Sequence, residues 1–153
     1  MENNGGERRV DHSALKVNQA FIIALLLLAF IVDSWLLAAF VGFVMLLGTA
    51  APRLSLFKSV YNYFLRPAGI VKPQLLVDNP EPHRFAQGLG GLFVSLAVGA
   101  LLLGQTLAGW ALIWVVVVLA ALNLFLGFCA GCFIYYQLSR IGLPGFTRRP
   151  MAN

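Results

Sequence analysis

The stretch AFIIALLLLAFIV, residues 20–32, contains no charged side chain and no polar one. Extended back to Lys16, it approaches the length of about 20 residues that an α-helix needs to cross the hydrocarbon core of a bilayer. Asp33 and Ser34 then interrupt the apolar run, and serine is a residue type that caps a following helix. We therefore predict a first membrane-spanning helix over residues 16–32.

The composition of the whole chain also indicates a membrane protein. Of the 153 residues, 59% are hydrophobic and 11% are charged, whereas about a quarter of the residues of a soluble domain are charged. The mean hydropathy is +0.81. A chain of this length cannot bury so much apolar surface in water. We expect an integral, multi-pass membrane protein that has the lipid bilayer as its main partner.

Three further apolar runs predict three further spans, at residues 35–51, 83–104 and 110–137. Short turns at residues 33–34 and 105–109 join the spans in pairs, so the four spans form two hairpins. Small residues that allow close helix approach recur along the third span: Gly88, Gly91, Ser95 and Gly99. The predicted fold class is an all-α membrane protein with four transmembrane helices.

The segment between the two hairpins has a different pattern. RLSLFKSVYNYFLR, residues 53–66, places apolar side chains at helical spacing on one face and basic side chains on the other. This pattern predicts an amphipathic helix that lies along the membrane surface. We further predict a disordered tail over residues 1–10, an irregular connector over 67–82, a membrane domain over 11–138 and a basic C-terminal tail over 139–153.

The positive charges predict the orientation. All 11 Lys and Arg residues fall in the two terminal regions and the central segment, and neither hairpin turn contains one. The positive-inside rule places these regions on the cytoplasmic side, so both termini are expected there. The net charge of +5 then reflects topology and attraction to anionic lipid. The pattern lacks the interleaved aromatic residues that stack on bases, which excludes nucleic acid as the expected partner.

The only two cysteines of the chain, Cys129 and Cys132, stand three residues apart in GFCAGCFIYY, residues 127–136. In a continuous span that starts at Trp110, they lie near the cytoplasmic boundary, about 20 residues along the helix. Residues three apart on a helix have Cα atoms about 5 Å apart, which a disulfide can bridge. Late in a helix, however, the dipole disfavours a thiolate, so nearby cations must compensate.

Polar residues of the first and third spans enter the membrane at the depth of the cysteines: Asp11, Lys16, Asn18, Gln19, His83, Arg84 and Gln87. We expect Lys16 and Arg84 to stabilise a thiolate or to bind a small anion. Cys132, nearer the water, is expected to be the more reactive thiol and Cys129 the resolving one. The simpler alternatives are a helix cap for Asp11 and boundary anchors for Lys16 and Arg84.

Two alternatives to a redox role remain for the cysteines. They are small residues that can simply pack in a membrane helix. They could also bind a metal together with His12 and His83, which requires two histidines far apart in the sequence to converge. No cofactor is predicted.

Three stretches of the sequence resemble one known family: VDHSALKVNQAF (10–21), PHRFAQGLG (82–90) and GFCAGCFIYY (127–136). This is the bacterial membrane-protein family called domain of unknown function 4395, and the resemblance covers about residues 10–137. It implies a multi-pass protein of the bacterial inner membrane without an established activity. Its pattern would select Asp11, Asn18, Arg84, Gln87, Cys129, Gly131 and Cys132, with Lys16 where the family has arginine. Genes of the family often lie near those for thioredoxin-like or sulfurtransferase proteins, which implies thiol or sulfur chemistry.

Three functions compete at this point. The leading one is a cytoplasm-facing membrane dithiol protein that exchanges disulfides with a thioredoxin-like or sulfurtransferase partner, as an oxidoreductase or its partner. The second is a carrier of a small anion or sulfur compound, bound by Lys16, Arg84 and Gln87. The third is a structural or assembly subunit without chemistry. Four short spans bury little surface against each other, which favours a homodimer.

Overall fold

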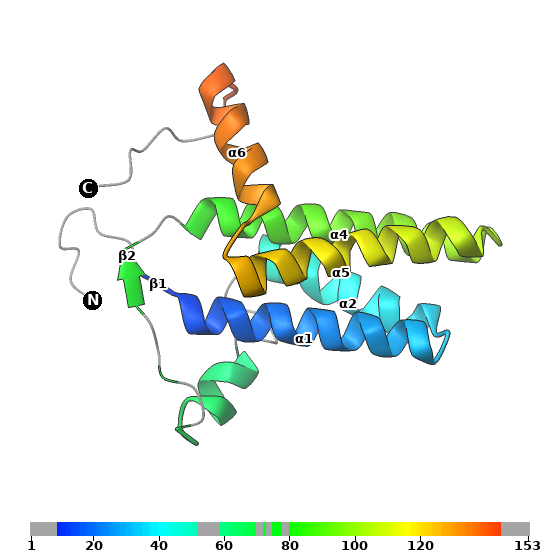
Figure 1. The fold of residues 1–153 in the computed structure, drawn as a ribbon, viewed down its shortest axis with the longest axis horizontal. Helices are drawn as coiled ribbons and strands as arrows, with labels where there is room; N and C mark the ends of the chain where they lie inside the picture. Colours follow the sequence, from blue (N-terminus) through cyan, green and yellow to red (C-terminus); the bar gives the residue numbers. More distant parts are fainter. Residues whose placement is uncertain (1–8, 52–58, 70–71, 73–74, 78–79, 145–153) are drawn as a thin grey trace.

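The computed structural model describes residues 9–51, 59–69, 72, 75–77 and 80–144. The predictions for residues 1–8, 53–58 and 145–153 lie outside these ranges. Within them the elements follow in the order β1 (Arg9–Asp11), α1 (His12–Ile31), α2 (Trp35–Ala50), η2 (Tyr61–Leu65), β2 (Leu75–Val77), α4 (Pro80–Leu102), α5 (Thr106–Leu126) and α6 (Ala130–Ile141). The long helices α1, α2, α4 and α5 lie side by side as two antiparallel hairpins (Figure 1).

The helices have the lengths and surfaces of membrane spans. In the described part of the chain, α1, α4 and α5 are long and apolar enough to cross a bilayer, and α2 is a shorter apolar helix of 16 residues. Large apolar side chains point outward from the bundle, with Ile31 76% and Leu107 87% exposed. Soluble monomers rarely expose such surfaces. The prediction of a helical, multi-pass membrane protein is confirmed, and a complete crossing by α2 stays a prediction.

The two predicted helix caps are present. The Asp11 carboxylate accepts hydrogen bonds from the backbone N–H groups of Ser13 and Ala14, at 3.0 and 3.4 Å. The Ser34 hydroxyl accepts one from the N–H of Leu37, at 3.4 Å. Both bonds satisfy donors that the first turn of a helix leaves without an intrahelical partner.

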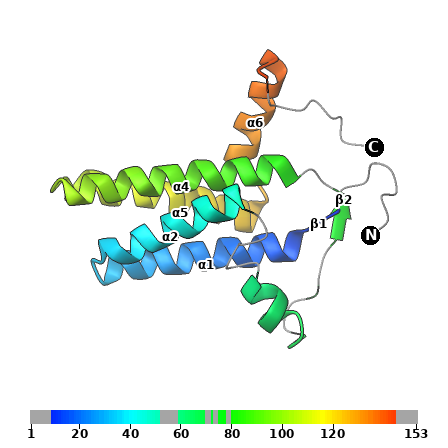
Figure 2. The ribbon, with the colours of Figure 1, turned by 180° about the vertical axis from the view of Figure 1, so that it is seen from behind.

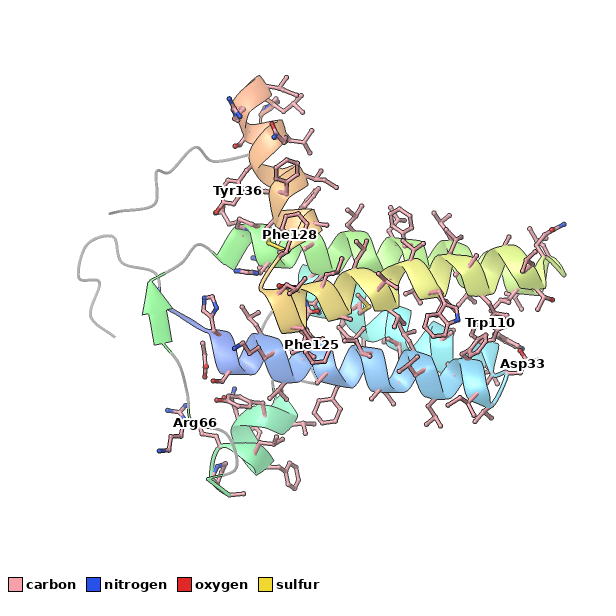
Figure 3. The ribbon with its side chains drawn as sticks, in the orientation of Figure 1. Asp33, Arg66, Trp110, Phe125, Phe128 and Tyr136 are labelled. Carbon is pink, nitrogen blue, oxygen red and sulfur yellow. A yellow bond between two sulfur atoms is a disulfide. The ribbon has the colours of Figure 1, made fainter. Side chains whose placement is uncertain are left out.

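The turn between α1 and α2 is bound to the beginning of α5, next to the turn of the second hairpin. Asp33 adopts a φ of +52°, which few residues other than glycine tolerate. Its Oδ1 accepts a hydrogen bond of 3.1 Å from Trp110 Nε1, and Figure 3 shows the two side chains at the end of the bundle away from α6. The Phe30 ring packs edge-on against Trp110, with centroids 5.3 Å apart. These contacts fix the two hairpins to each other.

Replacing Trp110 by phenylalanine tests this contact. The variant keeps an aromatic ring beside Phe30 but removes the indole N–H that donates a hydrogen bond to Asp33. We expect the free energy of unfolding in detergent micelles to fall by roughly 1 kcal/mol. Trp114→Phe is the matched control, since Trp114 also packs edge-on against Phe30, at 5.5 Å. Equal losses in the two variants would show that the hydrogen bond contributes nothing.

The small residues of α4 allow it to pack closely on α2. A Cβ added at Gly88 would lie 2.9 Å from the Thr49 side chain, and one at Gly91 would lie 3.0 Å from Leu46. The predicted close approach is therefore confirmed at these two positions. It does not extend to Gly99, which has open space around its Cα.

A short β-ladder closes the end of the bundle near α6. β1 pairs with β2 in antiparallel register, with Arg9 opposite Val77 and Asp11 opposite Leu75. The prediction of a disordered tail over residues 1–10 is therefore wrong at residues 9 and 10, because the distant strand β2 supplies their hydrogen bonds. The Ser13 hydroxyl also donates to the carbonyl of Lys72, at 2.7 Å. The connector is thus tied to the start of α1.

The predicted surface helix is described only from residue 59 onward. Its C-terminal part is helical and ends in the π-helical turn η2. Tyr61 is fully buried beside the start of α1, whereas Tyr63 and Phe64 are exposed. Burial raises the pKa of the Tyr61 phenol, and the neighbouring Asp11 carboxylate raises it further, so the phenol is neutral at physiological pH.

Candidate functional site

The predicted fourth helix is in fact two helices that meet at the cysteines. α5 ends at Leu126, and the next residue, Gly127, has a φ of +67°, a left-handed conformation that suits glycine and ends helices. α6 begins at Ala130 and runs across the end of the bundle instead of along it (Figure 1 and Figure 2). The prediction of one continuous helix over residues 110–137 is therefore wrong.

This break places Cys129 at the N-terminus of a helix. Cys129 is the N-cap of α6, and its Sγ accepts a hydrogen bond of 3.2 Å from the backbone N–H of Cys132. The N-terminus of a helix carries a partial positive charge. The local field therefore favours a thiolate at Cys129, the opposite of what a position late in a helix predicts.

The two cysteines differ in accessibility. Their sulfur atoms lie at disulfide distance and their Cα atoms are 5.1 Å apart, close to the separation that the sequence spacing predicts. Cys132 is only 9% exposed, and Cys129 is partly exposed. Cys129 is therefore the more exposed residue of the pair.

Contacts with α4 fix the position of the cysteine-bearing helix. Gly131 packs directly on Ala86 of α4, and an added Cβ would lie 2.6 Å from the Ala86 Cα atom. The Tyr135 hydroxyl donates a hydrogen bond of 2.9 Å to Glu81 Oε2. Gly131 therefore packs against α4, whereas a Cβ added at Gly127, between the two helices, would meet nothing within 4 Å.

A histidine of α4 lies beside the buried sulfur. His83 Nδ1 is 3.6 Å from Cys132 Sγ. This imidazole can therefore hold the proton that the Cys132 thiol gains or loses when the disulfide opens or closes. The sequence pattern indicated only an interfacial or metal-binding histidine here, because the contact depends on the turn of α6 across α4.

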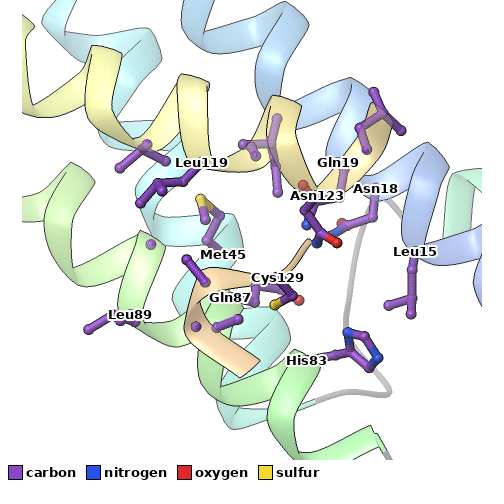
Figure 4. Close-up of a pocket in the computed structure, with 18 of the residues that line it drawn as sticks. Leu15, Asn18, Gln19, Met45, His83, Gln87, Leu89, Leu119, Asn123 and Cys129 are labelled. Carbon is purple, nitrogen blue, oxygen red and sulfur yellow. The ribbon is translucent and has the colours of Figure 1, made fainter. Parts of the chain in front are cut away.

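A cavity of about 190 Å³ lies next to Cys129, between α1, α4 and α5 (Figure 4). Its deeper wall is apolar and includes Ile22, Phe93 and Leu119. The end near the cysteines is polar and is lined by His12, Lys16, Asn18, Gln19, His83, Gln87, Asn123 and Cys129. The dithiol thus opens onto a pocket inside the membrane domain.

A family model described as a domain of unknown function, DUF4395, matches residues 10–140, which include both cysteines. The chain belongs to this family. No curated protein and no solved structure matches the chain of this DUF4395 protein. Membership confirms the resemblance carried by the three sequence motifs, and it assigns no activity.

The DUF4395 structure brings together some of the predicted site residues and separates others. Lys16, Asn18 and Gln87 line the cavity with Cys129. Arg84 instead points to α2, where its Nη2 donates a hydrogen bond of 2.7 Å to the carbonyl of Thr49. It therefore satisfies a carbonyl near the C-terminus of that helix. Of the two expected cations, only Lys16 lines the cavity with Cys129, and Asp11 acts as the cap of α1.

The sequence-based reading also missed part of the site. Asn123 lines the cavity but is not among the polar residues that the sequence predicts at the depth of the cysteines, whereas Gln19 is among them and also lines the cavity. Their shared signal is a polar amide inside an apolar span, which is rare and marks a buried polar site. Three such amides in α1 and α5, at Asn18, Gln19 and Asn123, converge on one space.

The residues of a possible metal site in the DUF4395 chain come together only in part. The ligand atoms of His83, Cys129 and Cys132 lie within 4.8 Å of one another. The rings of His12 and His83 also converge, with centroids 6.0 Å apart. In the reduced state, the two thiolates and His83 could hold a zinc ion. Cysteine binds zinc only as a thiolate, so the disulfide state of Cys129 and Cys132 cannot form this zinc site.

Proposed function

We propose that this DUF4395 protein is a membrane protein that exchanges disulfides with a partner. In the disulfide state Cys129 is the sulfur that the partner thiolate attacks, and in the dithiol state Cys129 is the nucleophile. The observation that carries the proposal is the position of Cys129 at the N-cap of α6, where the Cys132 N–H donates to its sulfur. Such a position stabilises a thiolate both as a nucleophile and as a leaving group. This reverses the roles that the sequence alone predicts for the two cysteines.

The exchange reaction has two steps. First, a thiolate of the partner attacks Cys129 Sγ, the Cys129–Cys132 bond breaks, and Cys132 leaves and takes a proton, for which His83 is in reach. Second, the other partner thiolate attacks the partner sulfur of the mixed disulfide and releases the Cys129 thiolate. The partner loses two electrons and becomes a disulfide, and the membrane protein becomes a dithiol. The reverse sequence reduces a partner disulfide.

We further propose that the dithiol faces the cytoplasm and that the partner is a thioredoxin-like protein or a sulfurtransferase. The positive-inside rule supports this orientation, because basic residues gather at the end of the bundle that carries α6. Helix α6 itself has exposed apolar side chains at Phe133 and Ile141 and a basic residue, Arg140, in its last turn. An amphipathic helix of this kind suits the membrane surface.

The anion-carrier alternative receives less support from the structure. It requires Lys16, Arg84 and Gln87 around one ligand, but Arg84 donates to the Thr49 carbonyl of α2. Of these three residues, only Lys16 and Gln87 line the cavity. Proteins usually bind an anion through two parallel N–H groups of one arginine or through several hydrogen-bond donors. We therefore place thiol chemistry first.

A trapping experiment tests the exchange function and the orientation together. In sealed inside-out membrane vesicles, the Cys132→Ser variant should form a mixed disulfide with a thioredoxin that retains one active-site cysteine, activated as its mixed disulfide with 2-nitro-5-thiobenzoate. The Cys129 thiolate displaces thionitrobenzoate, and neither protein then has a second thiol to resolve the adduct. The adduct should disappear on treatment with dithiothreitol, and right-side-out vesicles should form none. Cys129→Ser, the matched control, should form no adduct in either orientation.

Two results would contradict the proposal in different ways. An adduct only in right-side-out vesicles would place the dithiol on the outer face and overturn the orientation. Equal adducts with Cys129→Ser would show that the position at the start of α6 does not select the reactive sulfur.

A further inference from the structure

We propose that the cavity beside Cys129 binds the ring of a membrane quinone, which accepts the electrons of the dithiol. The inference rests on the proposed exchange function and names the oxidant that renews the disulfide. Among the residues that line the cavity is Cys129 but not Cys132. A molecule in this space therefore meets the accessible sulfur directly.

The size of the cavity selects the class of ligand. Its volume is about 190 Å³, and an apolar protein cavity of about 150 Å³ binds benzene. One substituted six-membered ring fits this space. The cavity lies between helices that are long and apolar enough to span a bilayer. A ligand that is already dissolved in the membrane can therefore approach it.

The polar end of the cavity carries hydrogen-bonding atoms that have no protein partner. These are Asn18 Oδ1, Gln19 Oε1 and Gln87 Nε2, all buried. Asn18 is only 4% exposed and lines the cavity, and Figure 4 shows its side chain beside Asn123 at the polar end. Buried polar atoms in proteins are nearly always hydrogen-bonded. The hydroxyl groups of a hydroquinone would donate to the Asn18 and Gln19 oxygens, and a quinone carbonyl would accept from Gln87 Nε2.

The type of polar residue also fits a quinone. A quinone presents carbonyl groups, which accept hydrogen bonds, and the hydroquinone formed from it presents hydroxyl groups, which donate them. A side-chain amide offers both a donor and an acceptor. Asn18, Gln19 and Gln87 can therefore bind both redox states, as a reaction that converts one into the other requires. The apolar wall at Ile22, Phe93 and Leu119 suits the ring itself.

The electron transfer balances within this site. The Cys129 thiolate adds to a ring carbon of the quinone and forms a sulfur–carbon bond. The Cys132 thiolate then attacks Cys129 Sγ and forms the disulfide, for which the Cα separation of 5.1 Å is suitable. The sulfur–carbon bond breaks and its electron pair stays on the ring. The two protons lost by the thiols complete the hydroquinone, so two electrons leave the dithiol and two arrive on the quinone.

The test uses the full chain in detergent micelles with ubiquinone-1 as the probe. The protein is reduced, freed of reductant without oxygen and mixed with the quinone, while quinone absorbance and free thiols are followed. We expect one quinone reduced and two thiols lost per chain. Asn18→Leu should slow the reaction roughly three- to tenfold, the effect of one hydrogen bond. Gln137→Leu, which removes an exposed amide from α6, is the matched control and should react like the wild type.

A second variant covers the case in which Asn18→Leu fails to fold. Ala120 lines the cavity, so Ala120→Leu fills part of the space without removing a polar group, and it should slow the reaction as well. Wild-type rates in both variants would show that the quinone reacts elsewhere and would overturn the cavity assignment.

The outcomes separate this inference from the proposed function. A wild-type protein that exchanges disulfides with thioredoxin but does not reduce ubiquinone-1 would refute the quinone and leave disulfide exchange intact. A protein that does neither would refute both.

Discussion

In the reduced protein, the Cys132→Ser variant should react with iodoacetamide on the order of ten to a hundred times faster than the Cys129→Ser variant. The first variant retains Cys129, which is partly exposed and receives a hydrogen bond from the N–H of residue 132 at the positive end of α6. The second retains Cys132, which is 9% exposed. Only the thiolate form of a cysteine reacts with iodoacetamide. The variant that retains Cys129 should therefore react faster, because its thiolate is stabilised and more exposed.

The comparison requires folded protein in a mild detergent and a pH series. The difference should be largest near neutral pH and should shrink at high pH, where both thiols are ionised and only accessibility still separates them. Unfolding in dodecyl sulfate is the control, because it removes the helix N-terminus and should bring the two rates together. A faster reaction of Cys132 in the folded protein would restore the assignment that a continuous helix implies, and would contradict the proposed exchange mechanism.

The general architecture was predictable because it depends on local and additive properties of the chain. The apolar run at residues 20–32, the interruption at Asp33 and the capping groups of Asp11 and Ser34 each act over a few residues. Their effects do not depend on how the helices later pack. The membrane class and the two hairpins follow directly from them.

The break between α5 and α6 was not predictable from hydrophobic pattern. The residues around it, Phe125, Leu126 and Phe128, are as apolar as the span before them, so length and hydropathy favour one long helix. The only local signal is Gly127, since a glycine can end a helix in the left-handed conformation but can also pack inside one. This one ambiguous residue decides whether the cysteines meet the negative or the positive end of a helix dipole.

The composition of the site was partly predictable. The sequence indicates the depth at which Lys16, Asn18 and Gln87 enter the membrane, and all three line the cavity with Cys129. It does not indicate the direction in which each helix face points. Arg84 has the predicted depth but faces α2, because Gly88 and Gly91 of the same helix pack α4 tightly against that neighbour. Which polar residues share a space therefore depends on tertiary packing.

Gly131→Ala should both destabilise the protein and weaken the redox site. The new Cβ would lie 2.6 Å from the Cα atom of Ala86, so the backbones of α6 and α4 must separate. Overpacking of this kind costs roughly 1–3 kcal/mol of the free energy of unfolding. The same displacement moves Cys132 away from His83, now 3.6 Å from its sulfur. Disulfide exchange with thioredoxin should therefore slow more than denaturant unfolding alone would explain.

Gly99→Ala is the matched control for this variant. Gly99 lies in α4, where an added Cβ meets nothing within 4 Å. There the substitution should stabilise the helix by about 0.5–1 kcal/mol, because alanine loses less backbone entropy than glycine. The opposite signs of two identical substitutions separate packing from helix propensity. If Gly131→Ala also stabilises the protein and leaves the exchange rate unchanged, α6 does not rest on Ala86, and the position of Cys129 at the mouth of the cavity no longer has a structural basis.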